Sequence, residues 1–129
     1  MMTTTGFEMV IANMTVTEVN AFNVILDDAI NASEKFNKAV NEEFLNFNIG
    51  FEDANKLSTF FTTAFLKAVK KRSETGIACH LEKFDEELQN IDIVCDTRPE
   101  LFRDNINLMT ALMKFHTTMG ELARALGMK

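Results

Sequence analysis

The chain has 129 residues, a length typical of one domain built around a single hydrophobic core. Hydrophobic residues make up 47% of it, with 12 Phe, 8 Met and neither Trp nor Tyr, a composition that excludes a disordered chain. The formal net charge of −6 argues against direct nucleic-acid binding, because neutralisation of phosphates supplies most of the affinity for duplexes.

The sequence contains no run of eighteen apolar residues, so no membrane-spanning helix is expected. Residues 1–14 lack the basic region of a signal peptide, and Glu8 interrupts their apolar stretch. Cys79 and Cys95 are the only cysteines, which is typical of a reducing compartment. We therefore expect a cytoplasmic protein.

Residues 1–14 show no helical period, and we expect an N-terminal arm that is either extended or disordered. No repeat or Pro-Gly linker divides the remaining chain. Residues 15–129 are therefore predicted to form a single helical-bundle domain.

The first predicted helix runs from about residue 15 to residue 47. Thr15 can cap its start, and Glu18 completes a capping box. Apolar and small residues at three-four spacing mark its buried face: Val19, Phe22, Leu26, Ala29, Ser33, Phe36, Val40, Phe44 and Phe47. Val24 and Leu45 fall on the polar side of this helix.

The second predicted helix runs from about residue 52 to residue 75. Its predicted buried stripe is Leu57, Phe61, Ala64 and Ala68, with Leu66 on the opposite side. Gly76 is interpreted as the stop after its C-terminus.

The third predicted helix, from about residue 78 to residue 94, has a narrow apolar stripe: Ile77, Leu81, Phe84, Leu88, Ile91 and Cys95. Ile93 falls off this stripe. The fourth predicted helix has Thr97 as its cap and Glu100 as the partner in a capping box, and it extends to about Leu126. Asn105 falls on its main apolar seam, where a lone polar residue often fixes the packing register.

Four amphipathic helices joined by short connections form neighbouring antiparallel pairs. The sequence therefore predicts an all-α fold, an up-down-up-down four-helix bundle with an N-terminal extended arm.

No motif for catalysis or metal binding emerges from the sequence. A di-metal bundle needs inward-pointing Glu-x-x-His pairs, which do not occur. Cys79, His80, Cys95 and His116 have no spacing typical of a zinc site, and we expect His116 to be a packed residue. Nucleophilic triads, phosphate-binding loops and calcium loops are also missing from the sequence. We expect a protein that is not an enzyme and that holds neither a metal nor a cofactor.

The fourth predicted helix carries two apolar seams. Its main seam is Leu108, Leu112, Phe115, Met119, Leu122 and Leu126. A second seam comprises Phe102, Ile106, Met109 and Met113, and seven residues further on it reaches Gly120. Glycine inside a helix is about 1 kcal/mol less favourable than alanine, and close approach of another helix would explain its presence. The second seam packs either inside the chain or against a partner, and the sequence leaves both alternatives open.

The third predicted helix carries an acidic surface. Its members are Glu82, Asp85, Glu86, Glu87 and Asp92.

We expect a small acidic protein-binding module that acts through the second seam, as an adaptor, a chaperone-like binder or an inhibitor of a larger protein machine. Its partner is a protein, and association as a homodimer is one expected form. One alternative is an inhibitor that presents the acidic surface to a basic nucleic-acid-binding groove. Another alternative is a structural subunit of a homo-oligomeric assembly.

Overall fold

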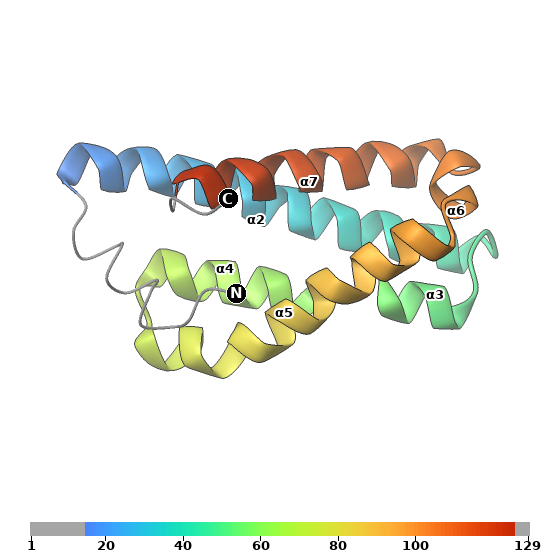
Figure 1. Cartoon of the computed structure of the whole chain (residues 1–129), viewed down its shortest axis with the longest axis horizontal. Coiled ribbons are helices and arrows are strands. Elements are labelled where there is room, and N and C mark those ends of the chain that lie inside the picture. Colours follow the sequence, from blue (N-terminus) through green and yellow to red (C-terminus); the bar gives the residue numbers. More distant parts are fainter. Residues whose placement is uncertain (1–14, 126–129) are drawn as a thin grey trace.

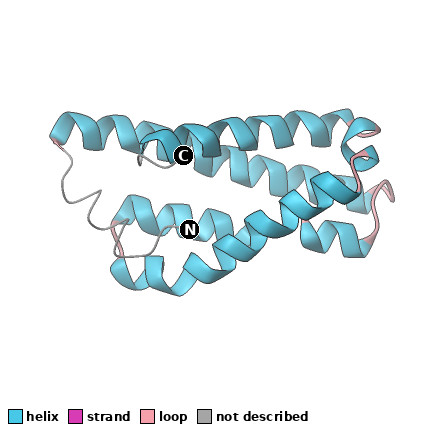
Figure 2. Ribbon diagram, viewed as in Figure 1, coloured by secondary structure: helices cyan, strands magenta, loops and turns pink. Residues whose placement is uncertain are grey.

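The computed structural model describes residues 15–125 of the chain. Its helices are α2 (Val16–Leu45), α3 (Phe51–Lys56), α4 (Phe60–Lys71), α5 (Glu74–Thr97), α6 (Glu100–Arg103) and α7 (Ile106–Ala125). Helices take up 86% of the described residues, and no strand occurs among them (Figure 2). The all-α prediction is confirmed. The predicted N-terminal arm and Leu126 lie outside the described residues.

The helices are arranged around two long pairs. Helix α7 packs along α2, and α4 packs against both α5 and α2 (Figure 1). The short helices α3 and α6 lie at the same end of the molecule, on the right in Figure 1. Breaks in the second and fourth predicted helices create these short helices, so the specific up-down-up-down four-helix bundle is not confirmed.

Helix α2 begins where the sequence predicts. The Thr15 hydroxyl accepts a hydrogen bond from the Glu18 amide at 3.2 Å, and the Glu18 carboxylate accepts one from the Thr15 amide at 3.3 Å. The predicted apolar face is buried from Phe22 to Val40. It fails at Phe47, which lies beyond the end of the helix and is 95% exposed.

The second predicted helix is interrupted between α3 and α4. The Thr59 hydroxyl donates to the Ser33 carbonyl at 2.7 Å, and the Thr59 amide donates to Asn37 Oδ1 at 3.2 Å. These bonds to α2 replace the bonds of a continuous helix. Helix α4 then turns a different face inward: Leu66 is completely buried, whereas Phe60 is 65% exposed. Of the predicted stripe, Leu57 and Ala68 are buried, whereas Phe61 and Ala64 are only half-buried, and the prediction that Leu66 lies on the opposite side is wrong.

The prediction that Gly76 stops a helix is also wrong. Helix α4 ends at Arg72, whose φ of 55° is left-handed, and Gly76 lies in the first turn of α5. A Cβ atom on Gly76 would lie 3.0 Å from the Cβ of Ala68. Glycine is thus needed here because α4 and α5 approach each other closely.

The junction before α7 differs from the predicted capping box. Thr97 does not cap a helix, because its hydroxyl donates to the Ile93 carbonyl within the last turn of α5, at 2.7 Å. Asn105 lies between α6 and α7, where its side-chain amide donates to the Leu101 carbonyl at 2.6 Å. Asn105 therefore helps to end α6 instead of fixing a register within one long helix.

The core consists of two apolar clusters. The first combines Phe22, Leu26, Ala29, Ile30, Phe65, Leu66, Ala68, Val69, Ile77, Phe84 and Leu122. The second combines Phe36, Val40, Ile49, Leu57, Ile91, Val94, Leu101, Phe102, Leu108, Leu112 and Phe115. The half-buried Leu88 and Met119 pack against both clusters.

Helices α2, α5 and α7, and the start of α4, each carry buried polar residues that lie, in the sequence, between the residues that enter the first cluster and those that enter the second. We call this set the polar layer: Ser33 from α2, Thr59 and Thr62 from the start of α4, Glu87 from α5 and Thr118 from α7. Buried polar groups must find hydrogen-bond partners inside the protein. Those on α2, α4 and α5 find them largely in one another.

Within the polar layer, Glu87 connects α5 to the start of α4. Its Oε1 accepts from the Thr62 amide at 2.6 Å and from the Thr62 hydroxyl at 2.8 Å. Its Oε2 accepts from the Ser58 hydroxyl at 3.2 Å. Because the N-terminus of a helix carries unpaired amides and a partial positive charge, Glu87 caps α4 from a neighbouring helix.

We predict that Glu87→Ala lowers the free energy of unfolding by about 2–4 kcal/mol, because it leaves buried donors of Thr62 unpaired and removes the cap of α4. Chemical denaturation followed by circular dichroism measures this loss. Glu86→Ala is the matched control, since Glu86 is exposed and, among residues 15–125, pairs only with Lys83, at 3.3 Å. The control should change stability by less than about 0.5 kcal/mol. Equal losses in the two variants would contradict the role of Glu87.

Candidate functional site

None of the helices between residues 15 and 125 is both long and apolar enough to cross a membrane. In the same part of the chain, no group of three or more His, Cys, Asp or Glu side chains is placed to hold a metal ion. His116, expected to pack inside the protein, is exposed.

The second seam of the fourth predicted helix is divided by the structure. Phe102 is only 3% exposed and belongs to the second apolar cluster, so its assignment to an interaction surface is corrected. The break at Asn105 gives α6 its own orientation, which turns Phe102 inward. Met109 is half-buried against the same cluster, whereas Ile106 and Met113 are 78% and 62% exposed. Gly120 is half-buried.

Only some residues of the predicted acidic surface are exposed in the structure. Glu87 is buried in the polar layer, so its placement on a solvated surface is corrected. Asp85 is half-buried, and this burial raises the pKa of its carboxyl above the usual value. Glu86 pairs with Lys83. Glu82 and Asp92 remain exposed, without an ion pair in the described part of the chain.

A larger exposed apolar surface lies at the end of the molecule that carries α3. We call it the end patch; its residues and their exposed fractions are Leu45 (71%), Phe47 (95%), Phe51 (74%), Phe60 (65%) and Ile93 (52%). Leu45 and Ile93 are among the residues that the sequence places off the buried stripes. The sequence instead predicts Phe47 on the buried face of the first helix, so it does not predict the end patch.

Adjoining hollows connect the members of the end patch. Leu45 and Phe60 line a groove of about 620 Å³ between α2 and α4. Leu45 also lines a second hollow of about 510 Å³, together with Phe47 and Phe51. Phe51 and Ile93 line a third hollow of about 490 Å³. Neighbouring hollows thus share lining residues, Leu45 between the first and second and Phe51 between the second and third.

Phe47 occupies a backbone position that suits glycine. Its φ of 62° is left-handed, and its amide donates to the Phe44 carbonyl at 3.1 Å. The Asn48 amide donates to the Glu43 carbonyl at 2.9 Å, which completes a Schellman motif at the end of α2. A side chain at this position is strained, and the exposed ring gains little from burial. Neither the backbone nor the core therefore favours phenylalanine here.

Neighbouring rings hold two aromatic members of the end patch in place. Phe51 meets Phe44 edge-on, with 6.1 Å between the ring centroids. Phe60 meets Phe61 edge-on at 5.2 Å. Such contacts restrict the rings before any partner binds, which reduces the entropy lost on binding.

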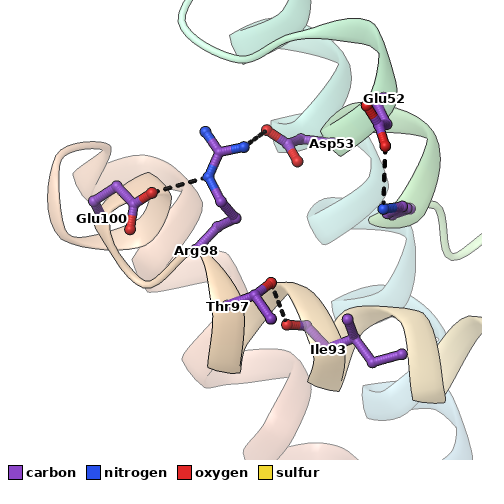
Figure 3. A network of polar contacts seen from close by, with 7 residues as sticks. Glu52, Asp53, Ile93, Thr97, Arg98 and Glu100 are labelled. Carbon is purple, nitrogen blue, oxygen red and sulfur yellow. Dashed lines mark hydrogen bonds and ion pairs between the residues drawn. The ribbon is translucent and has the colours of Figure 1, made fainter.

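Charged groups beside Phe51 and Ile93 are paired with one another (Figure 3). The Arg98 guanidinium bonds Glu100 at 2.9 Å and Asp53 at 3.2 Å. The hydrogen bond to Glu100 has the largest effect on the pKa of Arg98, followed by the charge of Asp53, and both raise this pKa. The pKa of Glu100 is lowered by a hydrogen bond from its own backbone amide and by Arg98. Arg98 thereby ties α3 to the end of α5.

The groove between α2 and α4 differs in its charges. Glu34, Lys38, Glu42 and Lys67 line it, and none of them forms an ion pair with another residue in the range 15–125. Two acidic and two basic side chains are therefore free to meet charges of a partner.

Comparison of the chain with protein-family models, with curated proteins and with solved structures found no match.

We predict that Phe47→Gly raises the free energy of unfolding by about 1 kcal/mol, because glycine adopts the left-handed conformation without steric strain. Thermal and chemical denaturation measure the change. Phe47→Ala is the control, since it removes the ring and keeps the strained Cβ, and it should leave stability nearly unchanged. A loss of stability in Phe47→Gly would show that the ring supports the fold.

We predict that the two thiols react at different rates. Both cysteines are free in the structure, with Cys79 exposed and Cys95 half-buried against the second apolar cluster. Burial, and then the charges of Asp92 and Asp96, raise the pKa of the Cys95 thiol. Because the thiolate is the reactive form, Cys95 should be labelled more slowly by a chromogenic disulfide reagent, and its rate should rise further into alkaline pH. Equal rates for the Cys79→Ser and Cys95→Ser variants would contradict this assignment.

Proposed function

We propose that this chain is a protein-binding module and that the end patch is its binding surface. The observation that supports this most is that five exposed apolar side chains line three hollows that share residues. Contiguous exposed apolar patches on soluble proteins commonly mark interaction sites. The free cysteines are in keeping with action in the cytoplasm.

The partner that suits the groove is an amphipathic helix. One wall is a stripe on α2 at helical spacing, Glu34, Lys38, Asn41 and Leu45. The other wall is a stripe on α4, Phe60, Ala64 and Lys67. Two such stripes on packed helices form a seat into which the apolar face of a third helix fits.

The charges of the groove specify the flanks of that helix. Glu34 and Glu42 favour basic residues on the partner, whereas Lys38 and Lys67 favour acidic ones. Apolar residues of the helix would contact Leu45 and Phe60, and the segment after it would reach Phe47 and Phe51. Binding of a helical segment is common to an adaptor, a chaperone-like binder and an inhibitor.

A displayed library of amphipathic helical peptides, selected on the wild-type protein, tests this proposal. Titration calorimetry then compares selected peptides on two matched variants. Leu45→Ser with Phe60→Ser removes the two exposed apolar side chains of the end patch that line the groove, and Val16→Ser with Val24→Ser removes two exposed side chains (79% and 60%) elsewhere on α2.

We expect the end-patch variant to bind about 10- to 100-fold more weakly, since aromatic anchors dominate interface energies. The Val16 and Val24 variant should bind as the wild type does. Peptides that bind both variants equally would show that the end patch is not the binding surface.

A further inference from the structure

Helix α7 carries a second exposed surface, on the side that faces away from the core. We call it the α7 stripe: Ile106, Thr110, Met113, Thr117 and Gly120, all at three-four spacing. The first four are exposed, and Gly120 is half-buried. The α7 stripe holds no charged residue over a length of about 21 Å.

The two threonines add to the apolar character of the α7 stripe. The Thr110 hydroxyl donates to the Ile106 carbonyl at 2.8 Å, and the Thr117 hydroxyl donates to the Met113 carbonyl at 2.9 Å. Because these hydroxyls have partners within the helix, a neighbouring helix could cover them without breaking their hydrogen bonds.

Nothing among residues 15–125 requires the glycine at position 120. Outside the helix backbone, the nearest atom to a Cβ placed there would be a guanidinium nitrogen of Arg124, at the ordinary contact distance of 3.7 Å. At Gly76, by contrast, a Cβ would meet Ala68 at 3.0 Å. The glycine leaves the α7 stripe without a side chain at this position, beside the exposed side chain of Arg124.

One flank of the α7 stripe carries opposite charges at heptad spacing. Lys114 and Glu121 lie seven residues apart, so they project from the same side of α7. Neither side chain forms an ion pair with any residue that the structure describes. Both are therefore available for pairing with another chain.

We propose that the α7 stripe packs antiparallel against the α7 stripe of a second copy of this chain, about a two-fold axis between Thr117 and Thr118. In such a pair, equivalent flanks of the two helices face each other. Lys114 then lies level with Glu121 of the second copy, and Glu121 lies level with its Lys114. The register thus forms two equivalent ion pairs.

The same register matches side-chain sizes. It places Met113 within about 3 Å, along the helix axis, of the level of Gly120 of the second copy. The 62% exposed Met113 side chain would pack against the backbone of Gly120, beside the Arg124 side chain. Charge and size, two independent properties of the sequence, therefore select one register.

A single helix pair is a small interface, typical of transient association. We expect a dimer with a dissociation constant of about 10–100 μM, observable by sedimentation equilibrium. This association does not depend on the proposed function, because the α7 stripe and the end patch share no residue.

Charge reversal tests the register. Lys114→Glu and Glu121→Lys each place like charges opposite one another, so each variant should remain a monomer up to about 1 mM. A one-to-one mixture of the two variants should dimerise again, because every pair between them joins opposite charges. Circular dichroism checks that both variants are folded.

Gly120→Leu adds a bulky side chain at this contact and is a better helix former, so it should weaken dimerisation at least 10-fold without loss of helix. Phe47→Ser with Phe51→Ser is the control and should dimerise as the wild type does. The proposal is wrong if the wild type stays monomeric up to about 1 mM. It is also wrong if the charge variants dimerise alone, or if their mixture stays monomeric.

Discussion

The contact of Glu87 with the start of α4 is the constraint on which the rest of the structure depends. A helix N-terminus buried between two other helices leaves amides that water does not reach, and each unpaired amide is destabilising. Glu87 pairs with the Thr62 amide, and Ser33 and Asn37 bind Thr59 from the other side. Because α4 must begin where these partners lie, it cannot continue from α3. The break in turn sets the rotation of α4 and exposes Phe60 beside Leu45.

Local signals in the sequence account for most of the helical structure. The capping box of Thr15 and Glu18 marks the true start of α2, and apolar spacing identifies the buried residues from Phe22 to Val40 and from Leu108 to Leu122. Both signals act within a few residues, so sequence reasoning finds them. The break before α4 depends on Glu87, which lies 25 residues from Thr62, and no local pattern reveals such a partner.

The candidate site was only partly visible in the sequence for a related reason. Leu45 and Ile93 are apolar residues on polar helix faces, and that mismatch signals an exposed surface. Phe47 continues the spacing of the buried face of α2, although the helix ends at Leu45. Its left-handed backbone turns the ring outward, which spacing alone does not show. The acidic run of α5 shows the opposite case. Glu87 lies three residues after Phe84 and four before Ile91, on the buried face, although its charge is typical of a surface residue.

The end patch and the α7 stripe differ in how strongly the fold constrains them. The end patch is formed at the end of α2 and at the break before α4, the second of which the polar layer imposes. Contacts with Phe44 and Phe61 hold two of its rings in place. The α7 stripe lies on an uninterrupted helix whose opposite side packs on α2, so its residues could change without disturbing the core. A dimer formed through the α7 stripe would carry two end patches. Two sites on one particle bind a partner with repeated or clustered helices more tightly than either site alone, because the second contact forms within the complex. A weak dimer contact would then make binding by the end patch depend on the concentration of the chain.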